Sequence, residues 1–224
     1  MEIRPGSVRK IHILPRRAGR LAQVASLANR VGIPIRESDP ATLRDLTGST
    51  DHQGVAALSE PYRYTEFDAV TSTEARALLL LDQIQDPRNL GALLRTAAAA
   101  GVDAVILPRN GAVGVTPTVE KASAGSAMDV AVCRVTNLSR ALATLRAREF
   151  WSVACVPRGG ENLFEMTLPE RIVLVLGGEA GLRPLVERSC DLRASIPLRL
   201  GVESLNTSVA GAIAMYELRR RRGS

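Results

Sequence analysis

From residue 75 onward, short apolar runs alternate with amphipathic segments, and this alternation constrains the fold of the 224-residue chain more than any other feature. Each run has the length of a buried strand, and each intervening segment repeats its apolar residues at helical spacing. Strands alternating with helices predict an α/β fold with a mostly parallel sheet covered on both faces. The predicted strands are residues 78–81, 104–107, 130–135, 151–156, 172–176 and 194–197. The predicted helices are residues 90–100, 117–125, 138–148, 184–189 and 205–222.

The first 60 residues repeat this alternation over shorter segments and are predicted to form a separate small α/β unit (residues 1–60). A unit of this size is small for an independent core. Residues 61–74 show no sustained period and are predicted to be a linker, which leaves residues 75–224 as the main domain. The strands predicted in the small unit are residues 8–14, 33–35 and 54–58. One helix has an apolar face formed by Leu21, Val24, Ala25, Ala28 and Val31.

The composition excludes some functions and favours others. A net charge of +6 and a pI near 9.9 favour a polyanionic partner. The sequence has no apolar run of membrane-spanning length and no signal-peptide pattern, so we expect a cytoplasmic protein. Cys133, Cys155 and Cys190 form no Cys-x-x-Cys pair, and the only histidines are His12 and His52. We therefore expect no metal site.

Basic residues gather in two clusters, one near each end of the sequence. Each cluster is either a solvated charged tail or a set of phosphate contacts, and the sequence alone leaves both interpretations open. The first cluster comprises Arg9, Lys10, Arg16, Arg17 and Arg20, and the second is the run of four arginines at 219–222.

Ligands of parallel sheets bind at the carboxyl ends of strands, and three predicted strand ends lead into unusual loops. The first loop enters the helix at 90–100, where Asp86 or Asn89 is suited to cap the first turn. Arg88, Gly91 or Ala92, and Arg95 are expected to share an exposed face of this helix. Two guanidinium groups over a glycine at a helix start are typical of a phosphate site. An ordinary amphipathic helix would also leave both arginines in solvent.

The second loop, residues 177–181, reads Gly-Gly-Glu-Ala-Gly and follows the strand at 172–176. Its glycines would either let a ligand approach the backbone beside Glu179 or simply form a tight turn. The loop matches neither the phosphate-loop pattern ending in Gly-Lys-Ser/Thr nor the dinucleotide-binding pattern Gly-x-Gly-x-x-Gly.

The third loop enters the C-terminal helix and presents hydroxyl and amide groups at its first turn, from Ser204, Asn206, Thr207 and Ser208. A well-capped core helix is the alternative interpretation. Small residues predict that this helix packs close to another element, namely Ala210, Gly211, Ala212 and Ala214. Larger apolar residues recur at helical spacing, namely Leu205, Val209, Ile213 and Tyr216.

Together the three loops resemble the ordered motifs of the SpoU/TrmH-type RNA ribose 2'-O-methyltransferases of the SPOUT superfamily, over residues 76–220. The motifs are Asn89-Leu90-Gly91 with Arg95, then Gly177-Gly178-Glu179, then Ser204-Leu205-Asn206-Thr207-Ser208. Two further stretches resemble the branch that methylates a guanosine of large-subunit (23S) rRNA. They are Val135-Thr136-Asn137-Leu138 and His52-Gln53-Gly54.

This resemblance implies a deep C-terminal trefoil knot, a feature that general folding rules disfavour. It also implies that the knot holds S-adenosylmethionine as methyl donor, without a metal. By position, the cofactor-binding residues are Gly177, Gly178, Ile196, Leu198 and Leu205. Family members are homodimers that pack through their C-terminal helices, which would explain the small residues Ala210, Gly211 and Ala214. Close packing within one chain would explain them equally.

The resemblance also assigns catalytic roles. Asn89 and Asn206 would orient the ribose, Ser204 would contact RNA or Arg95, and Glu179 would hold its loop or an RNA-facing arginine. Arg95 is expected to bind the adjacent phosphate and stabilise developing alkoxide charge, because a guanidinium is too weak an acid to serve readily as the general base that the family suggests. The other expected RNA contacts are Arg88, Arg16 and Arg17.

The sequence departs from the family in two places. The second motif usually reads Gly-x-Glu-Gly-x-Gly, and here it is one residue shorter. The N-terminal unit resembles the small RNA-binding domain that precedes the catalytic domain in this branch. Its expected first helix has no counterpart, so the domain is either truncated or begins differently.

Methylation of a guanosine ribose in 23S rRNA is therefore the predicted function, and transfer RNA is the alternative substrate. A non-catalytic RNA-binding or ribosome-assembly factor on the same scaffold is a second possibility. An unrelated nucleotide-binding α/β enzyme is a third.

Overall fold

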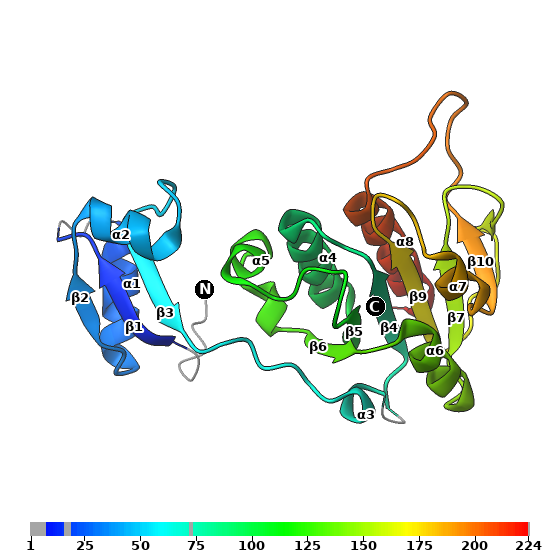
Figure 1. Ribbon diagram of the computed structural model, residues 1–224, viewed down its shortest axis with the longest axis horizontal. Helices are drawn as coiled ribbons and strands as arrows, with labels where there is room; N and C mark the ends of the chain where they lie inside the picture. The colour runs from blue at the N-terminus through cyan, green and yellow to red at the C-terminus, as the bar shows by residue number, and fades with distance from the viewer. Residues whose placement is uncertain (1–7, 16–18, 72–73, 224) are drawn as a thin grey trace. The chain divides into compact units, whose positions relative to one another are not determined.

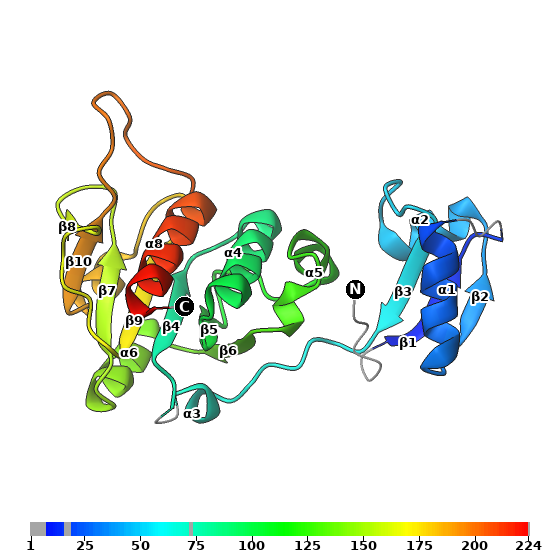
Figure 2. The same cartoon turned by 180° about the vertical axis from the view of Figure 1, so that it is seen from behind.

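The computed structural model describes residues 8–15, 19–71 and 74–223. Contacts divide the chain into two compact units, Met1–Tyr62 and Arg63–Ser224, each with its own sheet (Figures 1 and 2). No helix in the described part of the chain is long and apolar enough to cross a membrane.

The first unit is a three-stranded sheet with β1 in the centre, parallel to β2 and antiparallel to β3. Ala25 and Ala28 of α1 are buried against Ile11 and Ile13 of β1, as the apolar periodicity predicted. The elements are β1 (Val8–Ile13), α1 (Arg20–Arg30), β2 (Ile35–Glu37), α2 (Pro40–Thr47) and β3 (Val55–Ser59).

Helix α2 was not predicted, although its sequence carries ordinary helix signals. Asp39 caps the helix by accepting a hydrogen bond from the Thr42 amide at 2.8 Å, and Pro40 occupies the first turn. Strand β2 begins two residues later than predicted, because Pro34 has no N–H to pair and offers only its carbonyl, to the Ile11 amide. The expectation about a missing first helix concerns the start of the chain, where residues 1–7 lie outside the described residues.

The second unit contains a seven-stranded sheet in the order β6-β5-β4-β9-β7-β10-β8, with every strand pair parallel. The predicted parallel α/β architecture is therefore confirmed. Its strands are β4 (Ala77–Asp82), β5 (Ala104–Pro108), β6 (Ala131–Val135), β7 (Trp151–Cys155), β8 (Glu161–Asn162), β9 (Ile172–Gly177) and β10 (Leu192–Ser195). Its helices are α3 (Phe67–Val70), α4 (Pro87–Ala100), α5 (Pro117–Ala122), the 3-10 turn η1 (Ser126–Met128), α6 (Leu138–Ala147), α7 (Pro184–Arg188) and α8 (Thr207–Arg222).

Helices cover both faces of this sheet. On one face, Leu78 and Leu80 of β4 pack with Leu142 of α6 and Val186 of α7. On the other face, α4 and α8 lie side by side, with α4 against β5 and α8 against β9 (Figure 2). Because both faces are covered, every residue of β4 is buried.

Strand β10 lies two residues earlier than predicted. Its residues pair in parallel with β7, from Leu192 opposite Val153 to Ala194 opposite Cys155. Pro197, which has no N–H, cannot continue that ladder. Strand β8 has only two residues, too few to show a period in the sequence.

Part of the predicted linker belongs to the second unit. The Tyr64 hydroxyl accepts a hydrogen bond from the Val115 amide at 2.9 Å, and the Thr65 amide donates to the Val132 carbonyl at 2.8 Å. Val70 of α3 is buried in the second unit's core. The structure therefore differs from the predicted 61–74 linker, because scattered aromatic and apolar residues anchor this stretch without forming a period.

Helix α8 buries its small residues within the chain. A Cβ atom on Gly211 would lie 2.5 Å from Leu93 Cδ2 and 3.0 Å from Leu176 Cδ1, and Ala214 is also buried. Close packing within one chain thus accounts for these two residues. Val209 and Tyr216 are instead 49% and 51% exposed on the opposite side of the helix.

The arginines at the end of α8 hold the helix against the domain. The Arg219 guanidinium donates to the Ala99 carbonyl, Arg221 donates to the Leu163 carbonyl at 3.0 Å, and Arg222 donates to the Glu170 carbonyl at 2.7 Å. Glu217 is 6% exposed and accepts hydrogen bonds from both Arg220 and Arg221. These contacts show that the cluster is not a freely solvated tail, while Arg219, Arg220 and Arg222 remain exposed.

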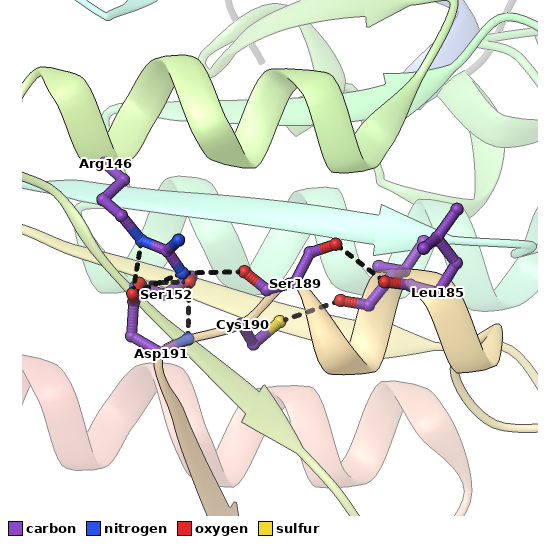
Figure 3. Close-up of polar contacts among 7 residues, drawn as sticks. Arg146, Ser152, Leu185, Ser189, Cys190 and Asp191 are labelled. Atoms are coloured by element: carbon purple, nitrogen blue, oxygen red, sulfur yellow. Dashed lines mark hydrogen bonds and ion pairs between the residues drawn. The ribbon is translucent and has the colours of Figure 1, made fainter.

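A second polar cluster joins α6, β7 and the turn before β10 (Figure 3). The Asp191 carboxylate accepts hydrogen bonds from the Ser152 amide at 2.9 Å and from Arg146 Nε at 2.6 Å. Burial tends to raise the pKa of Asp191, but the hydrogen bonds from Ser152 and Arg146 outweigh it and hold that pKa below its ordinary value. The ionised cluster ties the amino end of β7 to the helical layer.

Candidate active site

The predicted site lies at the carboxyl edge of the sheet, where β4 and β9 end side by side with Asp82 opposite Gly177. The loop after β4 leads into α4, and the Asp86 carboxylate caps this helix by accepting a hydrogen bond from the Arg88 amide at 2.8 Å. Of the two possible caps, the structure therefore uses Asp86. Asn89, one turn further on, is left for another contact.

Asn89 meets Asn206, which lies 117 residues later in the chain. Asn206 caps α8, and its Oδ1 accepts hydrogen bonds from the Ser208 amide at 2.9 Å and the Ser208 hydroxyl at 2.6 Å. Its Nδ2 donates to Asn89 Oδ1 at 3.2 Å. Because Ser208 fixes the direction of the Asn206 amide, the Asn89 amide presents its own Nδ2 as a donor on its other side.

The glycines of the 177–181 loop serve close contacts between backbones. A Cβ atom on Gly177 would overlap the backbone of Gly181, and one on Gly178 would overlap the Gln83 carbonyl. The Gly177 carbonyl accepts a hydrogen bond from the Thr207 hydroxyl of α8 at 3.1 Å. These contacts fix the base of the loop, while Glu179 and Ala180 at its tip are exposed.

Of the two residues considered beside Arg88 and Arg95, Gly91 does not share their exposed face, and Ala92 is half-buried. Gly91 is buried and faces α5, where a Cβ atom would lie 2.5 Å from Ala122 Cβ. Gly91 thus allows α4 and α5 to pack closely. Arg88 and Arg95 are both exposed on α4.

Three predicted catalytic side chains lie open to solvent, namely those of Arg95, Glu179 and Ser204. Among the residues that the structure describes, none of the three has a hydrogen-bond or ion-pair partner. The contact considered between Ser204 and Arg95 is therefore not made here, and neither is one between Glu179 and an arginine. Arg16 and Arg17 lie outside the described residues.

The remaining predicted cofactor residues lie on the segment from β10 to α8. Ile196, Leu198 and Leu205 are half-buried, and the chain between the last two projects beyond the sheet (orange in Figure 1). Leu200, in the turn within this segment, is fully exposed. In the described ranges, no group of three histidine, cysteine or acidic side chains is arranged to hold a metal ion.

Sequence reasoning missed two residues that shape this edge. Asp82 is 0% exposed and forms an ion pair with Arg183 at 2.8 Å. An acidic residue closing a buried apolar strand was the available signal, since a buried carboxylate requires a partner. Nothing in the sequence identified Arg183 as that partner.

Comparison with known proteins agrees with this geometry. Residues 76–216 match the model of the SpoU rRNA Methylase family, and residues 4–65 match that of the RNA 2'-O ribose methyltransferase substrate-binding domain. Two similar proteins are both named 23S rRNA (guanosine-2'-O-)-methyltransferase RlmB. The protein of Xylella fastidiosa (strain 9a5c) is 43% identical over 91% of this chain and 84% of its own length. That of Acinetobacter baylyi is 38% identical over 99% of this chain and 93% of its own length.

A solved structure shares the fold over both units. The crystal structure of an AdoMet-bound rRNA methyltransferase from Sinorhizobium meliloti is 26% identical, with a TM-score of 0.81 over 98% of this chain and 83% of that one. The match of the family model to residues 76–216 spans β4 to α8, the elements that form the site. The chain therefore belongs to the SpoU rRNA methylase family.

Proposed function

We propose that this protein transfers a methyl group from S-adenosylmethionine to the 2'-hydroxyl of a guanosine ribose in 23S rRNA. The observation that carries the proposal is the contact between Asn89 and Asn206, which unites the first and third motifs at one edge of the sheet. The names of the Xylella and Acinetobacter relatives support the choice of substrate. The basic net charge of +6 is consistent with a nucleic-acid partner.

The residues at this edge fit the cofactor. S-adenosylmethionine joins a flat purine to polar ribose and amino-acid groups. The half-buried side chains of Ile196, Leu198 and Leu205 suit the purine, and the exposed main chain at 179–180 offers hydrogen bonds to the polar groups. When bound, the cofactor supplies an electrophilic methyl group on its sulfonium.

The protein's part in the reaction is to position the ribose and stabilise charge. The free Nδ2 of Asn89 would donate a hydrogen bond to an acceptor oxygen of the ribose or its phosphate, in a direction set by Asn206. The exposed Arg95 guanidinium would bind the phosphate next to the target and stabilise negative charge on the 2'-oxygen as its proton leaves. Water at this exposed edge would accept that proton.

We propose in addition that the chain is knotted at the site. The Thr207 hydroxyl bonds to the Gly177 carbonyl, and Asn206 bonds to Asn89, so the start of α8 lies against the loops that follow β9 and β4. A homodimer packed through α8 is the matching proposal for its exposed face. Val209 and Tyr216, two turns apart, give that face an apolar stripe. We place the enzyme in the cytoplasm, where its proposed substrate is assembled.

Methyl transfer from labelled S-adenosylmethionine to unmodified ribosomal and transfer RNA tests the proposal, with the product nucleoside identified by mass spectrometry. The expected product is 2'-O-methylguanosine in 23S rRNA. Transfer to transfer RNA alone would keep the chemistry but overturn the substrate. RNA binding without any methyl transfer would favour the non-catalytic assembly factor.

A further inference from the structure

A buried carboxylate stands behind the proposed cofactor loop. Asp82 is the last residue of β4, and its side chain is fully buried. The five residues before it in the strand are apolar. A carboxylate at that depth requires strong hydrogen-bond partners, because burial in an apolar environment removes its hydration.

Arg183, which lies 101 positions later in the chain, makes three contacts with this carboxylate. Asp82 Oδ2 accepts a hydrogen bond from the Arg183 backbone amide at 2.9 Å, and Asp82 Oδ1 accepts one from Arg183 Nε at 2.9 Å. The ion pair between Arg183 Nη2 and Oδ1 is 2.8 Å long. Charge-assisted contacts of this kind are the strongest and most directional hydrogen bonds in proteins.

Asp82 also holds the other end of the same loop. Its main-chain carbonyl accepts a hydrogen bond from the Gly178 amide at 2.8 Å. Asp82 therefore holds both ends of the loop, because its backbone carbonyl binds Gly178 and its side chain binds Arg183. The loop tip at Glu179 and Ala180 is exposed, and within the described part of the chain neither residue forms a hydrogen bond or ion pair with the Asp82 side chain.

We propose that Asp82 and Arg183 form a positioning pair that sets the spacing of the 178–182 loop for cofactor binding. The pair acts through the loop backbone and touches neither the cofactor nor the RNA. The inference rests on the proposed role of this loop in holding S-adenosylmethionine. If the pair only stabilised the fold, its loss would lower the melting temperature but leave the cofactor Kd unchanged.

The test compares Arg183→Gln, Arg183→Lys and Asp82→Asn with the control Arg188→Gln, an exposed arginine at the end of α7, the helix that begins directly after Arg183. Isothermal titration with S-adenosylmethionine gives the cofactor Kd, and steady-state kinetics separate kcat from KM. We expect Arg183→Gln to raise the cofactor Kd and KM about tenfold, the usual effect of losing one charge-assisted hydrogen bond. Arg183→Lys should be affected less because it keeps the charge. RNA affinity, and kcat at saturating cofactor, should stay near wild type.

Equal cofactor Kd values for Arg183→Gln and Arg188→Gln, with only the melting temperature lowered, would overturn the inference. If Asp82→Asn does not fold, the two Arg183 variants decide the question, since that side chain is 44% exposed. Wild-type protein that binds no S-adenosylmethionine would refute the proposed function itself, so the two failures are distinguishable.

Discussion

Replacing Glu217 by glutamine should destabilise the second unit by an amount that follows from its electrostatics. The side chain is 6% exposed, and hydrogen bonds from Arg220, opposed by burial and reinforced by Arg221, lower its pKa from 4.5 to about 2. A shift of that size corresponds to about 3 kcal/mol in favour of the ionised form in the folded state. Glutamine removes the charge but keeps the shape, so we expect a loss of about 2 to 3 kcal/mol at pH 7.

The direction of the pKa shift determines how the contribution of Glu217 to stability changes with pH. Because the folded pKa is depressed, the contribution of Glu217 is fully present above pH 4.5 and is lost as the pH falls toward about 2. Wild type should therefore lose stability through that window more steeply than Glu217→Gln. At pH 7 the variant should be less stable by the full difference.

Urea unfolding followed by tryptophan fluorescence is the assay, because Trp151 is the single tryptophan and lies in the second unit. The matched control is Glu149→Gln, which neutralises an exposed carboxylate after α6. If Glu217→Gln and Glu149→Gln unfold at the same urea concentration as wild type at pH 7, the electrostatic reasoning is wrong.

Three further outcomes are expected. Arg95→Lys should keep part of the methyl-transfer rate while Arg95→Ala loses about 100-fold or more, and equal inactivity of the two would count against pure charge stabilisation. Ser208→Ala should lower kcat about tenfold with little change in melting temperature, because it removes the hydroxyl donor to Asn206 Oδ1 and leaves only the Ser208 amide to hold that side chain; an additive double variant with Asn89→Ala would contradict this coupling. Burial, with Lys10 and Arg36 nearby, lowers the pKa of His12, so the first unit should lose stability as the pH falls below about 6.5. Hydrogen exchange of the β1 amides at pH 7.5 and 5.5, corrected for intrinsic rates, measures that loss, and His12→Gln should abolish the difference.

Three strands of the second unit, β4, β5 and β9, were predictable because each is buried along its whole length and is therefore almost continuously apolar. β4, β5 and β9 begin and end within one residue of the predicted positions. The errors arise where tertiary contacts override local pattern, as at β10, whose start depends on pairing with β7 and whose end depends on Pro197. Helix α2 is an error of a different kind, since the Asp39 cap and Pro40 were visible in the sequence.

For the site, the loops at predicted strand ends and the family resemblance led us to expect Asn89 and Asn206 at one edge of the sheet. The structure brings their side chains into contact there, while their catalytic roles stay predictions. The sequence could not indicate that Gly91 faces α5, because a glycine in a helix carries no sign of which neighbour needs the space. The pairing of Asp82 with Arg183 was equally hidden, since a charge pair 101 residues apart leaves no local period.

The helix that begins at the site ends in the arginines that hold its far end. With 16 residues, α8 is about 24 Å long. It connects Asn206 at the site with the carbonyls to which Arg221 and Arg222 donate hydrogen bonds. A displacement of the far end along the helix axis would therefore also displace Asn206. Substitution of Arg221 or Arg222 should therefore lower the catalytic rate, although neither side chain lies at the active site.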